Sequence, residues 1–269
     1  MVDIALSLRA RRHSGTIYAA SRHGLLPRVH LAGGNWPAFL GEHIGRSPLQ
    51  LLRVLRAEFL AAARRDVPWQ RVIDAARPAV AQVWNRWNEA QRRQFLRHGR
   101  AFWDVHRHRL APRIGEALAQ MLGSGGIASL AGRLLDFYAG GEGLRVTIGP
   151  RHERDGHDIR VDHVINCTGP RSDYADIGAP LFVDLRQQGL IRPDTLGLGL
   201  ETSDARVIDA RGMVSDSLFA VGPLSRAAWW KSPPCRKSPP RWHVWLPCCP
   251  MVERRRPYAR WPGLSAIWA

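Results

Sequence analysis

The sequence INCTGP at residues 165–170, together with LFAVGPL at residues 218–224, decides the predicted fold. Each is a short apolar run that reaches a glycine. In α/β proteins, cofactors bind at the carboxyl ends of sheet strands, where glycine lets the backbone come close to the ligand. We therefore predict an α/β fold in which strands at 16–20, 161–167 and 218–221 share one sheet and form part of a dinucleotide site.

The composition limits the classes of protein and partner. The chain has 269 residues, with 39 Lys+Arg against 23 Asp+Glu and a net charge of +16. A basic protein attracts nucleic acid, phosphorylated cofactors or acidic membrane surfaces. Almost all of this charge is arginine, and GC-rich coding produces the same bias, so it is weak evidence for phosphate binding. No apolar run approaches the ~20 residues that span a bilayer, so we expect no membrane association.

The cysteines indicate a reducing compartment. There are four of them, without the spacing of a disulfide framework: Cys167, Cys235, Cys248 and Cys249. This usage, with a start that lacks the order of a signal peptide, predicts a cytoplasmic protein. His243 and the last three cysteines are potential zinc ligands, but their spacing fits no usual site, so we expect no metal.

The first half of the chain predicts one helix and strand followed by a helical insert. Residues 2–11 form an amphipathic pattern, and a strand at 16–20 follows. Helix then strand is the end of a β-α-β unit, whose first strand would precede Met1. After a Gly/Pro-rich loop at 25–46, Ser47 and Pro48 have the residue types of a helix N-cap and first turn. Helical periodicity then covers residues 48–65, 68–76, 78–109 and 111–122.

The second half predicts mostly strands, and then a change of composition. A hairpin is expected from 144–148 and 158–161, a buried strand at 161–167, a helix at 177–190 and strands at 205–209 and 218–221. Residues 231–269 contain eight prolines, four tryptophans, three cysteines and one acid. Such proline density opposes both helix and sheet interior, so we expect an irregular, disordered tail that resembles a translation in the wrong reading frame.

Several motifs occur in an order that resembles one known family. They are MVDIALSLR (1–9), SRHGLLP (21–27), VDHVINCTGP (161–170), RPDTLGLGL (192–200) and LFAVGPLSRAAWW (218–230). The sequence resembles, over about residues 1–230, the bacterial FAD/NAD(P)-binding proteins, a group of two-domain flavoprotein oxidoreductases. The family's two glycine-rich phosphate loops and its C-terminal helix have no counterpart here, so we expect a chain truncated at the front and out of frame after about residue 230.

The resemblance implies a fold, cofactors and an activity. It implies a partial Rossmann-like parallel sheet with a large helical insert and an irregular C-terminal tail. The expected divisions are a partial NAD(P)-binding unit at 1–46, a helical insert at 47–138, a hairpin with a return to an FAD-binding-type sheet at 139–230, and the tail at 231–269. The cofactors would be FAD and NADP, and the intact relative would transfer a hydride from NADPH to the flavin. Without the phosphate loops, we expect this activity to be impaired here, so its status as an enzyme is left open.

The same resemblance assigns candidate cofactor-binding residues at three strand ends. Ser21 and Arg22 follow the first strand, where a basic residue suits the 2′-phosphate of NADP. The other candidates are Thr168, Gly169 and Pro170 after the second strand, and Gly222, Pro223 and Leu224 after the third. Each group also fits an ordinary strand that ends in an exposed turn. Cys167 is expected to be a small buried strand residue rather than a redox thiol, and no catalytic residue is assigned.

Two other classes of function stay open. One is a non-catalytic truncated fragment. The other is a basic nucleic-acid-binding protein, because arginines and histidines alternate with aromatic residues over 92–109. That segment also fits a solvated basic face opposite an aromatic core stripe, so nucleic acid is the weaker expectation.

Overall fold

The computed structural model describes residues 1–141, 143–150, 156–169 and 172–230. The chain divides into two compact units, Met1–Arg171 and Ser172–Ala269. The expected tail and its zinc ligands lie outside the described residues.

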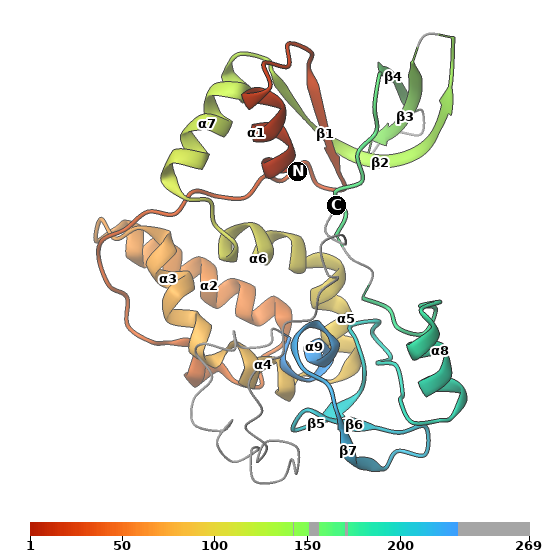
Figure 1. Ribbon diagram of the computed structural model, residues 1–269. Helices are drawn as coiled ribbons and strands as arrows, with labels where there is room; N and C mark the ends of the chain where they lie inside the picture. Colours follow the sequence, from red (N-terminus) through yellow and green to blue (C-terminus); the bar gives the residue numbers. More distant parts are fainter. Residues whose placement is uncertain (142, 151–155, 170–171, 231–269) are drawn as a thin grey trace, which may run out of the picture. The chain divides into compact units, whose positions relative to one another are not determined.

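In the first unit, two helix-then-strand segments lie side by side (Figure 1). Helix α1 (Val2–Ala10) leads to strand β1 (Ile17–Ser21), and helix α7 (Pro112–Gly123) leads to strand β2 (Ile127–Ala139). The two strands pair in parallel, with Ile17 opposite Ile127 and Ser21 opposite Ala131. This arrangement confirms the helix expected at 2–11 and the strand expected at 16–20.

Apolar side chains from both helices cover this parallel pair. The buried members of the cluster are Ala5, Leu118, Met121 and Ile127, and Ile17 and Ala19 pack against them. An α-helix buries one apolar stripe and a strand alternates its side chains between two faces, so the helices and the pair share one core. The apolar pattern of residues 2–11 therefore has the partner that an amphipathic helix needs.

The rest of this sheet is antiparallel, which corrects the expected parallel sheet. The strand order is β1-β2-β3-β4, and β2 pairs antiparallel with β3 (Leu144–Pro150), which pairs antiparallel with β4 (His157–Val161). The expected hairpin is confirmed. Strand β2, however, lies inside the range expected to be a helical insert, and the sequence interpretation missed it. The fold is α/β with a mixed sheet.

A group of helices separates β1 from α7 in the sequence. It contains the short 3-10 helix η1 (Leu40–His43), α2 (Pro48–Ala63), α3 (Trp69–Ala76), the 3-10 turn η2 (Arg77–Ala79), α4 (Val80–Arg86), α5 (Glu89–His98) and α6 (Arg100–Arg107). The start of α2 is confirmed: Ser47 and Gln50 form a reciprocal capping box, and Pro48 is the first helical residue.

The single helix expected at 78–109 is wrong. Trp87 adopts an extended conformation, and Asn88 begins α5 with its own capping box. Because the chain turns there, the rings of Trp84, Trp87 and Phe95 pack together, with centroids 5.4 to 6.4 Å apart. The aromatic spacing in the sequence reflects this core between two helices rather than one long stripe.

The buried strand expected at 161–167 is also wrong. Strand β4 ends at Val161, which is paired with Leu144, the first residue of β3. Beyond that point β3 offers no residue to pair with. Residues 162–169 are therefore irregular, and all of them are exposed. Within the described part of the chain, no strand pairs with them.

The second unit contains helix α8 (Pro180–Gln187) and a small antiparallel sheet of β5 (Thr202–Ser203), β6 (Arg206–Ile208) and β7 (Val214–Phe219), followed by the 3-10 turn η3 (Gly222–Ser225) and helix α9 (Arg226–Trp229). Its core contains Ile191, Leu200, Val207 and Ala220. The helix expected at 177–190 and the strand at 205–209 are confirmed with shorter bounds.

The three strands expected to share one sheet do not do so. Residues 17–21 belong to the sheet of the first unit, whereas residues 218–219 belong to β7 in the second. Residues 162–167 belong to no strand. Separately, no helix among the described residues is long and apolar enough to cross a membrane.

Candidate functional site

A tight turn closes the carboxyl end of β1. The amide of Gly24 donates a hydrogen bond to the carbonyl of Ser21 at 3.2 Å, and the Ser129 hydroxyl on β2 donates to the carbonyl of Gly24 at 2.9 Å. Gly24 has φ +61°, and a Cβ placed on it would lie 3.2 Å from the Cβ of Ala131. This residue must be glycine or strained, because its conformation is left-handed and β2 is close.

Arg22 lies exposed in this turn. Within the part of the chain that the structure describes, its guanidinium makes no hydrogen bond or ion pair. Ser21, just before it, is also exposed. A free guanidinium at the carboxyl end of a parallel strand can donate two parallel hydrogen bonds to a phosphate. Ser21 and Arg22 therefore lie exposed at the carboxyl end of a strand.

The second predicted group lies on the irregular segment after β4. The side-chain oxygen Oδ1 of Asn166 accepts hydrogen bonds from the Thr168 amide at 3.0 Å and from the Thr168 hydroxyl at 2.7 Å. Gly169 follows with φ +87°. These local bonds form an Asx turn rather than a strand end. Pro170 lies outside the described residues, and the thiol of Cys167 is exposed instead of buried.

The third predicted group belongs to the second unit. Gly222 has φ +71° and begins η3, with Pro223 as its second residue. The carbonyl of Leu224 accepts a hydrogen bond from the Leu200 amide at 2.8 Å. A Cβ on Gly199 would collide with that carbonyl, so Gly199 permits this close approach. The carbonyl of Leu224 therefore has a role inside its own unit.

The structure thus separates the predicted site residues. Ser21, Arg22, Thr168 and Gly169 belong to the first unit, whereas Gly222, Pro223 and Leu224 belong to the second. Only the Ser21–Arg22 pair lies at the end of a parallel strand. The sequence interpretation did not identify Ser129, whose hydroxyl holds the turn, because β2 itself was not expected.

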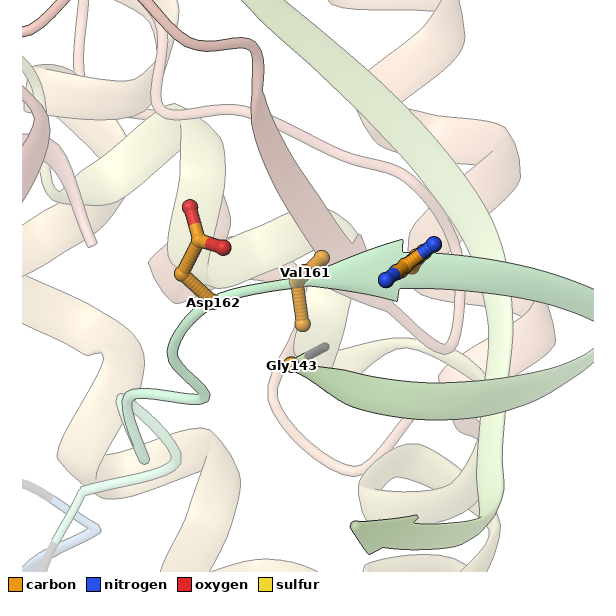
Figure 2. A pocket seen from close by; sticks show the side chains of 4 residues that line it. Gly143, Val161 and Asp162 are labelled. Atoms are coloured by element: carbon orange, nitrogen blue, oxygen red, sulfur yellow. The ribbon is translucent and has the colours of Figure 1, made fainter. Parts of the chain in front are cut away.

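A shallow hollow lies beside the end of β4. Gly143, Arg160, Val161 and Asp162 line it, and its volume is about 470 Å³. Figure 2 shows Val161 and Asp162 on consecutive positions, with Gly143, the residue before β3, close to them. Ligand pockets are concave, mostly apolar and enclosing. This open hollow, lined by one arginine and one aspartate, lacks those properties.

The described residues contain no candidate metal site: no group of three or more histidine, cysteine or acidic residues there could hold an ion. Comparison of the chain with family models, with curated proteins and with solved structures finds no match.

Proposed function

We propose that this chain is an FAD/NAD(P)-binding oxidoreductase-like protein that contacts the phosphate of NADP through Arg22 and whose own hydride transfer is impaired. One observation carries the proposal: a parallel strand, β1, preceded by a helix, ends in a glycine turn with an exposed arginine that makes no hydrogen bond or ion pair to any described residue. In dinucleotide-binding sheets the residue at the end of the second strand selects between NAD and NADP.

The local residues suit a phosphate monoester. The guanidinium of Arg22 offers a planar pair of donors, and the hydrogen bonds of Gly24 to Ser21 and of Ser129 to Gly24 hold the turn in place. A bound NADPH would supply the hydride, becoming NADP. Arg22 would orient it by its 2′-phosphate and would discriminate against NAD.

For the flavin, the chain offers less support. Residues 165–169 lie exposed and end no strand, and Gly222 belongs to another unit. We therefore assign these residues no contact with FAD and derive no electron-transfer step through it.

Binding of NADPH and NADH tests the role of Arg22. We expect the purified protein to bind NADPH at least ~10-fold more tightly than NADH, because one charge-assisted pair contributes about 1.5–3 kcal/mol. Arg22→Gln should abolish this preference. Arg113→Gln, which removes an exposed arginine from α7, should retain it. Equal affinities for the two nucleotides in the parent protein would contradict the proposal.

A non-catalytic protein is the second candidate. The exposed, irregular segment 162–169 favours it, since this segment carries the motif expected to line a cofactor. Purified protein with a flavin absorption band near ~450 nm, which is general flavin chemistry, would favour the oxidoreductase. Colourless protein that neither binds NADPH nor oxidises it would favour the non-catalytic candidate.

A further inference from the structure

Three arginines surround one carboxylate on the helical part of the first unit. Asp74 on α3 accepts a hydrogen bond from Nη2 of Arg109 at 2.6 Å, through Oδ1. Its other oxygen lies 3.1 Å from Nη2 of Arg71, and Nη1 of Arg77 lies 3.6 Å from Oδ1. Asp74 is thus shared by cations from α3, η2 and the chain just after α6.

Two of these arginines are fixed by the fold. The side chain of Arg109 is only 8% exposed, and its Nη1 donates to the carbonyl of Gln70 at 3.2 Å. Nη2 of Arg71 donates to the carbonyl of Leu31 at 2.8 Å. These hydrogen bonds hold Arg71 between α3 and the loop before η1, and they hold Arg109 against α3. Both guanidinium groups therefore have fixed positions.

Arg107, at the end of α6, adds a fourth positive charge to this group. Burial lowers the pKa of Arg107, and the neighbouring charges of Arg77 and Arg109 lower it further, while Asp74 acts in the opposite direction. Among the described residues Arg107 has no hydrogen bond or ion pair. The carboxylate on its own helix, Asp104, instead lies 3.5 Å from Arg100.

The arginines around Asp74 therefore carry more positive charge than this one carboxylate neutralises, and solvent reaches them at Arg77. Three guanidinium groups lie within 3.6 Å of one carboxylate, Arg107 adds a further positive charge to the same group, and the side chain of Arg77 is 45% exposed. Partly buried cations lose hydration, and a nearby anion compensates for that loss. Phosphate carries up to about two negative charges and matches the planar donors of arginine.

We propose that Arg77 and Arg107 bind a phosphate group on a small molecule, over the base formed by Arg71, Arg109 and Asp74. The ligand is inorganic phosphate or a phosphate monoester, which share this chemistry. The site is independent of Arg22, which lies in the turn after β1, so either site can exist without the other.

Thermal unfolding of the full chain in inorganic phosphate tests this site, with sodium chloride added to keep the ionic strength constant. A ligand that binds only the folded state stabilises it by RT ln(1 + [L]/Kd), so the Tm rises with the logarithm of the ligand concentration once that concentration exceeds Kd. We expect this rise in Tm for the parent protein, and the same rise for Arg97→Gln, which removes an exposed arginine from α5. Arg77→Gln and Arg107→Gln should each weaken phosphate affinity by at least ~10-fold.

The two variants separate loss of binding from loss of folding. Arg77 is half exposed, so Arg77→Gln leaves the core intact even if Arg107→Gln unfolds. A titration with glucose 6-phosphate beside inorganic phosphate distinguishes a monoester site from a site for the free ion. The proposal is overturned if phosphate raises the Tm no more than sodium chloride does at the same ionic strength, if Arg77→Gln responds like the parent, or if only an oligonucleotide stabilises the protein.

Discussion

Residues 17–24 and 161–169 were both expected to contain a strand that ends in a glycine turn. In the structure, only the first of them does so. Both contain several apolar residues and reach a glycine through polar ones. The first is a strand that pairs in parallel with β2 and packs against α1 and α7. The second leaves the sheet at Val161 and continues as an exposed, irregular chain.

This difference indicates that an apolar run forms a strand only where a neighbouring strand accepts its backbone hydrogen bonds and other elements pack on its side chains. Residues 17–21 have a paired strand on one side and two helices over one face, so the backbone groups that face β2 and the side chains of Ile17 and Ala19 find partners. Residues 162–169 have neither among the described residues, since β3 begins opposite Val161. Both segments were expected to be strands from their composition, and tertiary context decides.

Truncation of one isoleucine in each region should give the largest contrast. Ile127 is 3% exposed in the cluster beneath α1 and α7, whereas Ile165 is 52% exposed. We expect Ile127→Ala to lower the free energy of unfolding of the first unit by about 2–5 kcal/mol. Ile165→Ala should change it by less than about 0.5 kcal/mol. Urea denaturation followed by tryptophan fluorescence measures both, and similar losses would break the comparison.

Glycine replacements should give the next largest difference. Gly24 has φ +61° with Ala131 close by, and Gly169 has φ +87° in open space. We expect Gly24→Ala to cost about 1–2 kcal/mol, because alanine is strained in the left-handed region and the turn cannot relax against β2. Gly169→Ala should cost less, since its exposed segment can rearrange. A larger loss at Gly169 in the same urea experiment would show that the second segment is held more firmly than described.

Removal of a single hydroxyl in each region should give the smallest effect. Ser129 donates to the carbonyl of Gly24, and Thr168 donates to Asn166 within its own turn. Ser129→Ala should cost about 0.5–1.5 kcal/mol, the usual value for one hydrogen bond. Thr168→Val should leave stability unchanged, because its bond joins residues only two positions apart. Thermal unfolding of the two variants side by side distinguishes these outcomes.

The sequence predicted those parts of the fold whose causes are local. Ser47 with Pro48 marks the start of α2, because a capping box needs only four consecutive residues. The β3–β4 hairpin also follows from its own alternation and polar turn. Asn88, which begins α5 by the same capping chemistry, was overlooked inside a long helical pattern.

The parts that the sequence did not predict depend on distant partners. The pairing of Ile17 with Ile127 joins positions far apart in the chain, and β2 was not expected at all. Residues 161–167 carry a strand pattern, yet the length of β3 limits β4. For the same reason Arg22 could be identified as a residue at a strand end, while the Ser129 hydroxyl that holds its turn could not.

Amide hydrogen exchange resolved by mass spectrometry tests the contrast between the two segments most directly. Hydrogen-bonded amides inside a core exchange only through opening reactions, whereas exposed irregular chain exchanges freely. The account predicts that amides of residues 17–21 exchange at least ~100-fold more slowly than those of residues 163–169. Equal protection of the two segments would contradict it and would restore 161–167 as a buried strand.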